Sequence, residues 1–290
     1  ALFSASAHVP ERSRKSESGK TPVLAVEKVV RDYVQPRRNL FVRRPPFRAV
    51  DHVSFEISHG ENVGLVGESG CGKSTLDRSI LALDGLQGGD IRLNGHVFSS
   101  AGDGPHPELR ARMQVVFQDP YGSFNPRHRV RRLVTEPFHL VKFPPRGAEL
   151  ERRIDRALTE VGLTSSDADK YIHEFSGGQR QRIAIARALI IEPALIVLDE
   201  AVSALDVSIR AQILDLLAGL SDRLDLSYLF ISHDLSVVRA ITDRVLVMKD
   251  GKIVEQGETE SVFRNPQHPY TRKLVAATPS LEAALAAPAN

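Results

Sequence analysis

A glycine-rich run that ends in lysine and serine constrains this chain more than any other feature of its sequence. Residues Gly67–Thr75 read GESGCGKST and match the pattern G-x-x-x-x-G-K-[ST]. The apolar run Glu61–Val66 before it predicts a buried strand, and a helical pattern follows from Ser74 to about Leu83. A strand, a glycine-rich turn and a helix in this order form the context in which such a run binds phosphate. The sequence therefore predicts an α/β unit with a nucleotide site.

This run, which we call the phosphate loop (Gly67–Thr75), offers several kinds of ligand. Its glycines let the backbone curl until several N–H groups point at one anion, and the helix N-terminus adds its positive dipole end. Lys73 would place its charge on the β- and γ-phosphates, and the Ser74 hydroxyl would ligate Mg²⁺. The predicted nucleotide ligands are Gly67, Glu68, Ser69, Gly70, Cys71, Gly72, Lys73, Ser74 and Thr75.

Cys71 is the only cysteine in the 290 residues, which excludes a disulfide within the chain and a zinc site built on several thiolates. Its place in the phosphate loop has two interpretations. The nearby helix N-terminus could make the thiol reactive, or the residue could simply be small enough for a tight turn. In both cases we expect a bound nucleotide to shield it.

A second acidic site is predicted where the aliphatic run Ala194–Leu198 ends in Asp199 and Glu200. Ligands of open α/β sheets bind at the carboxyl ends of the strands, so both carboxylates would face the nucleotide. Asp199 is predicted to hold Mg²⁺, directly or through water, and Glu200 to polarise the attacking water. The alternative is a pair of solvated acids at a strand end.

The remaining pattern predicts a mainly parallel sheet with a helical insertion. Dipeptides Asn94-Gly95 and Asp250-Gly251 are hairpin signals. Strand-like runs are absent from about residue 119 to 191, where helical patterns return at 149–161 and 179–191. Short apolar strands that alternate with helices favour βαβ units. The expected strands outside the phosphate loop are 23–30, 50–57, 113–117, 194–198, 227–231 and 244–248.

The charged residues are distributed unevenly along the chain. Residues 1–48 hold eleven Lys and Arg against four Asp and Glu, whereas the whole chain is close to neutral at +2. The basic residues gather in two clusters, Arg12–Lys15 and Arg37–Arg48. Residues 1–22 have the composition of a flexible leader or interdomain linker. The clusters are either solvated linker or a segment that lies near anionic lipid head groups or an acidic partner.

The segment Phe175–Arg182 (FSGGQRQR) is similar to the signature of ABC transporter nucleotide-binding subunits, LSGGQ, with Phe175 in place of leucine. With the phosphate loop and the acidic strand end in the expected order, residues 23–280 strongly resemble this family. The resemblance implies that Ser176, Gly177, Gly178 and Gln179 contact the γ-phosphate of ATP held by an opposite subunit in a head-to-tail dimer.

The resemblance assigns roles to further residues. Gln118 matches the Q-loop glutamine, which would sense Mg²⁺ and the attacking water, and His233 matches the switch histidine, which would bind the γ-phosphate and orient Glu200. Asp206 closes the D-loop (Ser203–Asp206), which would cross the dimer interface. Tyr33 is the candidate for stacking on adenine, with Phe41 and Phe47 as alternatives. Where the family often has proline after the catalytic glutamate, this chain has Ala201.

Two segments narrow the resemblance to oligopeptide and dipeptide importers: Phe117–Arg127 and, in the tail, Asn265–Arg272. Importers of nickel, glutathione and peptide antibiotics share these segments, so the substrate stays open. Some members hold an iron–sulfur cluster on cysteines in the C-terminal extension. This tail has no cysteine, so we expect none.

The resemblance implies an α/β P-loop NTPase of the ABC ATPase fold, with a mainly parallel core sheet, an antiparallel β-subdomain and a helical subdomain. We expect a leader at 1–22, a nucleotide-binding domain at 23–257 with its helical subdomain at about 119–191, and an extension at 258–290. The implied cofactors are ATP and Mg²⁺. The implied partners are a second ABC ATPase domain, two transmembrane permease subunits and, indirectly, an external solute-binding protein.

The implied location is peripheral, on the cytoplasmic face of the bacterial inner membrane. Two forms of the chain stay open: a separate subunit, or the second half of a fusion of two ATPase domains. The alternative function is an ABC ATPase that acts on nucleic acid or ribosomes. The sequence argues against it, because it has no long heptad run and no patch of interleaved aromatic and basic residues.

Overall fold

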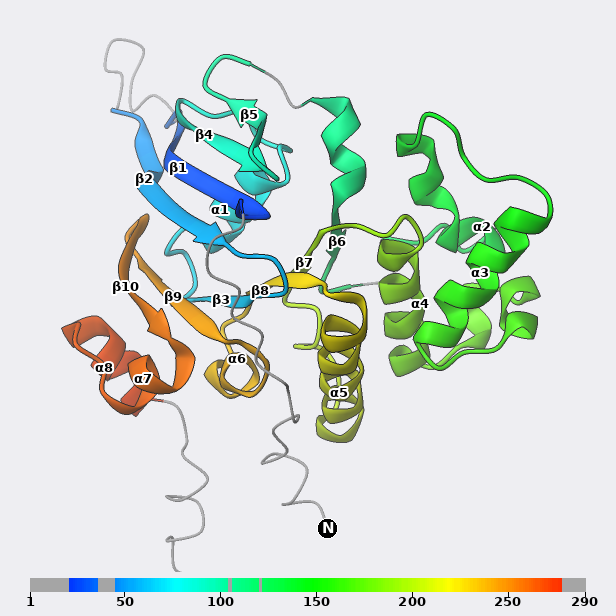
Figure 1. Ribbon diagram of the computed structural model, residues 1–290. Coiled ribbons are helices and arrows are strands. Elements are labelled where there is room, and N and C mark those ends of the chain that lie inside the picture. Colours follow the sequence, from blue (N-terminus) through cyan, green and yellow to red (C-terminus); the bar gives the residue numbers. More distant parts are fainter. Residues whose placement is uncertain (1–20, 36–44, 104–105, 120–121, 278–290) are drawn as a thin grey trace, which may run out of the picture.

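The computed structural model describes residues 21–35, 45–103, 106–119 and 122–277. Residues 1–20 of the expected leader, Phe41 and all basic residues of the two clusters except Arg48 lie outside these ranges. Figure 1 shows a small sheet above a larger one, a group of helices beside them, and two short C-terminal helices on the opposite flank.

The small sheet is antiparallel, in the order β2-β1-β4-β5. The predicted hairpin at Asn94 and Gly95 is confirmed, because both residues have positive φ and join neighbouring strands, as a two-residue hairpin turn requires. The strands are β1 (Leu24–Tyr33), β2 (Phe47–Ile57), β4 (Gly88–Leu93) and β5 (His96–Ser100).

The large sheet has the order β10-β9-β3-β8-β7-β6, and every neighbouring pair except β10 with β9 is parallel. The second predicted hairpin, at Asp250 and Gly251, makes the antiparallel turn. Strands β3 and β8 are buried along their whole length, as expected for central parallel strands covered on both faces. The strands are β3 (Asn62–Val66), β6 (Met113–Val116), β7 (Leu195–Asp199), β8 (Ser227–Ile231), β9 (Arg244–Lys249) and β10 (Lys252–Glu258).

Helices pack around the large sheet and form a lobe at one side of it (Figure 1). Helices α1 (Lys73–Ile80), α5 (Val207–Leu224) and α6 (Leu235–Ile241) follow β3, β7 and β8 in the chain. The lobe contains α2 (Val130–Val134), α3 (Ala148–Glu160) and α4 (Gly177–Leu189). Short 3₁₀ helices occupy Pro107–Arg112, Glu136–Leu140, Ser165–Asp169 and Ile172–Glu174.

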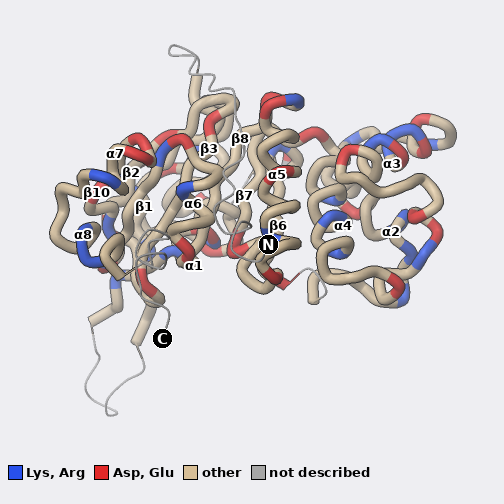
Figure 2. Tube along the Cα trace, turned by 90° about the horizontal axis from the view of Figure 1, so that it is seen from below, with Lys and Arg blue, Asp and Glu red and all other residues tan. Residues whose placement is uncertain are grey.

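Helix α3 shows how the lobe is held together. Its buried side chains, Ile154, Ala157 and Leu158, recur every three or four residues and so lie on one face. Acidic and basic residues alternate over the rest of the helix (Figure 2). Burial of a leucine or isoleucine contributes about 1.5–3 kcal/mol, so this face fixes the helix in the lobe.

The C-terminal helices α7 (Thr259–Arg264) and α8 (Pro269–Ala276) lie beside β9 and β10 (Figure 1). They share a small apolar cluster with the large sheet, composed of Val66, Leu235, Val238, Val245, Val247, Val262 and Tyr270. The expected fold class, with a mainly parallel core sheet, an antiparallel sheet and helices gathered to one side, is confirmed. Among the described residues, no helix has the length and apolar character needed to cross a bilayer.

Candidate nucleotide site

A cleft of about 510 Å³ lies where the phosphate loop meets the carboxyl ends of β7 and β8. It brings together five segments that are far apart in the sequence. The small sheet contributes Tyr33, Phe47 and Ala49; the phosphate loop contributes Ser69, Gly70, Gly72, Lys73, Ser74 and Thr75; the large sheet contributes Glu200 and His233. Six of the nine predicted ligands in the phosphate loop, together with Tyr33, therefore surround one space.

Glycine is required at two places in the phosphate loop. A Cβ on Gly67 would lie 2.3 Å from the carbonyl oxygen of Met248, and one on Gly72 would lie 2.4 Å from that of Ala49. Neither backbone oxygen can move cheaply. Gly72 also has a φ of 111° just before α1, which brings the helix N-terminus into line with the cleft. This backbone cradle fits a phosphate group.

Lys73 lies folded against the phosphate loop. Its ammonium donates to the carbonyl oxygens of Gly67 at 2.6 Å and Glu68 at 3.0 Å, and its side chain is buried. The Cys71 sulfur is 3.8 Å from the same ammonium and is also buried. The lysine is thus held at the cradle, with the thiol close to its ammonium.

Oxygen ligands of the type Mg²⁺ prefers lie at or next to the cleft, since Ser74 lines it and Asp199 directly precedes Glu200, which also lines it. Asp199 ends β7, and the Ser74 hydroxyl belongs to the first turn of α1. Burial raises the pKa of Asp199, repulsion from Glu200 adds to the rise, and Lys73 opposes it. A carboxylate whose charge is disfavoured in this way gains from a bound cation, so the donor set fits magnesium.

Asp77 is a further carboxyl that sequence reasoning missed. It lies one helical turn after Ser74 and is 2% exposed, and one of its carboxyl oxygens has no hydrogen-bond partner. Burial raises the pKa of Asp77 well above its ordinary value, and Asp199 raises it further. The signal was present in the sequence, because an acid stands in a helix where the neighbouring apolar pattern predicts burial.

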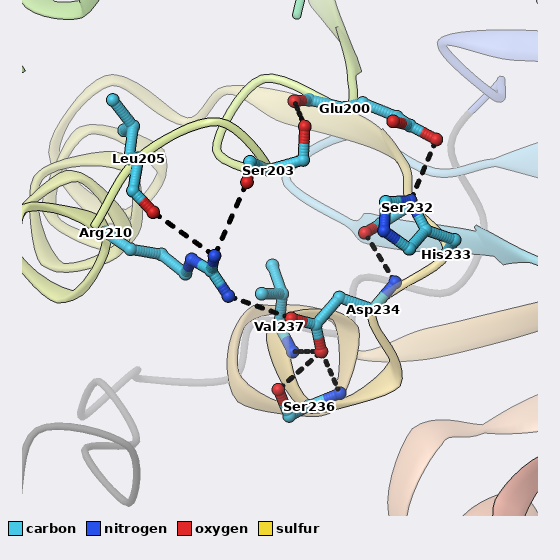
Figure 3. Close-up of polar contacts among 9 residues, drawn as sticks. All are labelled: Glu200, Ser203, Leu205, Arg210, Ser232, His233, Asp234, Ser236 and Val237. Carbon is cyan, nitrogen blue, oxygen red and sulfur yellow. Dashed lines mark hydrogen bonds and ion pairs between the residues drawn. The ribbon is translucent and has the colours of Figure 1, made fainter. Parts of the chain in front are cut away.

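Glu200 and His233 contact each other directly. The Glu200 carboxylate lies 3.0 Å from the His233 Nδ1 (Figure 3). Glu200 has a φ of 49°, and its backbone is held by the carbonyl of Ile231 and by the Ser203 hydroxyl. Glu200, predicted to polarise the attacking water, and His233, predicted to orient Glu200, therefore form one unit at the ends of β7 and β8.

Arg210 of α5 joins two loops beside this unit (Figure 3). Its guanidinium donates to the Asp234 carboxylate at 2.9 Å and to the carbonyl oxygen of Leu205 at 3.2 Å in the D-loop. Asp234 also caps α6 by accepting from the backbone of Ser236 at 3.0 Å. The D-loop is thereby tied to the residue that follows His233. An aspartate before a helix is a sequence signal for the cap, whereas nothing in the sequence signals Arg210.

The remaining predicted residues lie outside the cleft lining. Gln118 follows β6 and is exposed. Ser176 caps α4 by accepting from the backbone of Gln179, and the side chain of Gln179 accepts from the Ser176 N–H in return. Asp206 caps α5, and these hydrogen bonds lower its pKa. The signature residues Ser176, Gly177 and Gln179 are exposed at the end of the helical lobe.

Tyr33 and Phe47 stand opposite each other on β1 and β2, and both line the cleft. The Tyr33 hydroxyl donates to Asp84 at 3.0 Å, and the Arg31 guanidinium lies 4.9 Å from the ring centre. Phe47 is 53% exposed. Both rings of this pair are thus placed where an adenine base could stack.

Comparison with known proteins agrees with this arrangement. The family model described as ABC transporter matches residues 50–203, more than half of the chain. The chain belongs to the ABC transporter family. It is therefore an ABC ATPase, as the sequence predicted. A second model, the C-terminal region of oligopeptide/dipeptide transporters, matches residues 254–289.

Two curated relatives of this ABC ATPase cover most of its length. The dipeptide transport ATP-binding protein DppF of Haemophilus influenzae is 45% identical over 252 residues, which are 87% of this chain and 77% of that protein. The glutathione import ATP-binding protein GsiA of Escherichia coli K12 is 47% identical over 275 residues. That match covers 94% of this chain but only 44% of GsiA.

Solved structures of ABC proteins have the same fold. CbiO1 of Clostridium perfringens, part of the cbiONQ transporter complex, aligns with a TM-score of 0.72 at 28% identity, over 85% of this chain and 92% of its own. The cassette MJ0796, a dimer in a post-hydrolysis state bound to ADP and Pi, aligns with a TM-score of 0.69 at 26% identity, over 81% of this chain and 98% of its own.

Proposed function

We propose that this ABC ATPase hydrolyses ATP in the cleft between the phosphate loop and the ends of β7 and β8. Lys73 and the loop backbone bind the phosphates, while Ser74, Asp199 and Gln118 would hold magnesium. Mg²⁺ would supply charge neutralisation of the phosphate oxygens. Glu200 orients and deprotonates the attacking water, and His233 keeps the Glu200 carboxylate in place. Tyr33 stacks on adenine.

The observation that carries this proposal is the contact between Glu200 and His233 inside the same cleft as Lys73. A general base must lie within hydrogen-bond reach of a group that orients it and close to the site of the reacting phosphate. Here a carboxylate, an imidazole and an ammonium from three distant segments meet that requirement.

We further propose that the energy drives import of peptides or peptide-like solutes. The extension model and the two curated relatives support this class, because one is named for dipeptide transport and the other for glutathione import. They do not favour an ATPase that acts on nucleic acid. The domains are proposed at 23–257 and 258–290, with the helical subdomain at about 119–191.

The proposed assembly pairs the ATPase with a second ABC domain, two transmembrane permease subunits and, indirectly, an external solute-binding protein. The exposed signature supports a head-to-tail pair, because Ser176 and Gly177 lie outside their own chain's cleft and remain free to face a partner's phosphate. The proposed location of the ATPase is the cytoplasmic face of the inner membrane, where it would dock on the permease without crossing the bilayer.

Uptake in reconstituted vesicles tests the proposal. The ATPase, its permease subunits and the binding protein are expected to import a labelled dipeptide or glutathione only when ATP is present on the ATPase side. Labelled nickel serves as the competing substrate class. Lys73→Ala, which removes the ammonium from the cradle, is expected to abolish uptake and to weaken ATP binding at least about tenfold. Unchanged ATP affinity in this variant would count against the assigned site.

A further inference from the structure

The C-terminal extension reaches the phosphate loop through one side chain. Tyr270 lies in the first turn of α8, and its hydroxyl accepts a hydrogen bond of 2.8 Å from the backbone N–H of Glu68. The two residues are 202 positions apart in the sequence. Tyr270 is 7% exposed and shares an apolar cluster with Val66, the last residue of β3.

The Glu68 N–H belongs to the peptide group that joins Gly67 to Glu68. The other end of this peptide group is the Gly67 carbonyl, which accepts from the Lys73 ammonium at 2.6 Å. One rigid peptide plane therefore connects the tyrosine hydroxyl to the lysine that would bind phosphate. Hydrogen bonds at the N–H and the carbonyl of one peptide group strengthen each other, so a change in one hydrogen bond alters the strength of the other.

The position of Tyr270 is itself fixed. The Glu255 carboxylate of β10 accepts from the backbone of Gln267 at 2.7 Å and of His268 at 3.0 Å, just before α8 begins. Burial opposes ionisation of Glu255, but the Thr271 hydroxyl and these N–H groups outweigh it and lower the pKa of Glu255. The Lys249 ammonium lies 5.3 Å from the centre of the Tyr270 ring. These contacts fix the N-terminus of α8 against the large sheet.

We propose that Tyr270 is a positioning residue of the nucleotide site, which sets the Gly67–Glu68 peptide and through it the Lys73 ammonium. The extension then acts on ATP binding from behind the phosphate loop and does not touch the nucleotide. This inference rests on the proposed role of the loop in binding ATP. Because a neutral, part-buried hydrogen bond is lost, Tyr270→Phe is expected to raise the KM for ATP about two- to tenfold. The value of kcat is expected to change less than KM.

The single cysteine supplies a local readout. Cys71 is buried in the loop, so its rate of alkylation by a small maleimide reports how often the loop opens. In nucleotide-free protein, Tyr270→Phe is expected to speed this reaction. MgATP is expected to protect the thiol in the wild type, and the variant to need a higher MgATP concentration for half-protection.

Glu260→Gln is the matched control in the same extension. Glu260 of α7 pairs with Arg239 and Arg264, away from the phosphate loop. It is expected to leave the KM for ATP and the Cys71 alkylation rate unchanged. An equal shift in this control would overturn the proposal, because general loosening of the extension would then explain the effect. Glu255→Gln, which releases the start of α8, is a second variant expected to shift both readouts in the direction of Tyr270→Phe.

Failure of the proposed role of Tyr270 can be distinguished from failure of the proposed nucleotide site. If MgATP protects Cys71 equally in wild type, Tyr270→Phe and Glu255→Gln, Tyr270 has no positioning role, while the phosphate loop keeps its function. If MgATP does not protect Cys71 in the wild type, the assignment of the loop itself is wrong, and the role of Tyr270 falls with it.

Discussion

At the scale of single residues, the cleft contains charged side chains that are largely buried. Lys73 is buried among carbonyl oxygens, and Asp199 and Asp77 carry raised pKa values at the same end of the sheet. Such groups cluster at sites that bind ions, because an incoming ligand relieves the unfavourable charge. Two predictions belong to this scale.

Glu200→Gln is expected to keep ATP binding but to lower the rate of hydrolysis by about 10²- to 10⁴-fold, because an amide cannot accept the proton of the attacking water. Phosphate release under saturating MgATP measures the effect. Glu192→Gln is the control, since Glu192 is also a glutamate with positive φ but pairs with Arg153 and Arg156 away from the cleft. Near-normal turnover in Glu200→Gln would remove Glu200 from the role of base.

Asp77 predicts a pH dependence of stability. Its folded-state pKa lies above the unfolded value near 4, so the folded state binds its proton more tightly. Stability from this group is therefore complete at low pH and is lost as the pH rises through the raised pKa. Asp77→Asn, which mimics the protonated acid, is expected to melt at a higher temperature than the wild type at pH 8 and to show a smaller advantage at pH 5, closer to the unfolded pKa.

Melting curves of nucleotide-free protein from pH 5 to 8 measure this difference. The exposed Asp103→Asn is the control and is expected to follow the wild type at each pH. A constant offset between Asp77→Asn and the wild type across the range would contradict the raised pKa.

At the scale of elements, the sequence predicted seven of the ten described strands and both hairpin turns, because period and turn residues are local signals. The helix predicted to run from Ser74 to about Leu83 instead ends at Ile80, since Ala82 takes a positive φ that no helix continues through. Roles that depend on distant contacts escaped prediction. Arg210 meets Asp234 across 24 positions, and Tyr270 meets Glu68 across 202. No local pattern encodes such a meeting.

Arg210 ties the D-loop to the loop that carries His233, so it should affect the chemical step more than ATP binding. Arg210→Lys keeps the charge but loses the planar fork that reaches several acceptors at once. It is expected to lower kcat about two- to tenfold with little change in KM. Arg223→Lys, on the same helix and paired with Glu160, is the control in steady-state ATPase assays. A rise in KM alone would place Arg210 in nucleotide binding instead.

At the scale of the whole molecule, the nucleotide cleft and the exposed signature are separate surfaces of one chain. The two glycines of the signature differ in their surroundings. A Cβ on Gly177 would meet nothing within 4 Å, whereas one on Gly178 would lie 2.6 Å from the Ile209 side chain of α5. Gly178 is thus required by packing between α4 and α5, whereas no contact within the described part of the chain requires Gly177.

Gly177→Ala is therefore expected to leave the melting temperature unchanged but to weaken the dimer that forms with MgATP in the Glu200→Gln background. Gly178→Ala is expected to lower stability by about 1–3 kcal/mol, because the helices must separate. Sedimentation velocity with and without MgATP, alongside melting curves, measures both effects. A normal ATP-dependent dimer of Gly177→Ala would contradict a signature that faces a partner's phosphate.

The strand order of the large sheet has a consequence for synthesis. Strand β3, which carries the phosphate loop, pairs only with β8 and β9. Its residue Asn62 is translated 166 positions before its partner Tyr228. At about 5–20 residues per second, a ribosome needs roughly 8–33 s to make the intervening chain. During that interval the small sheet and the helical lobe can form from local segments, while β3 waits without either neighbour. The nucleotide cleft is therefore among the last parts of the chain to be completed, only after the ribosome has passed β9.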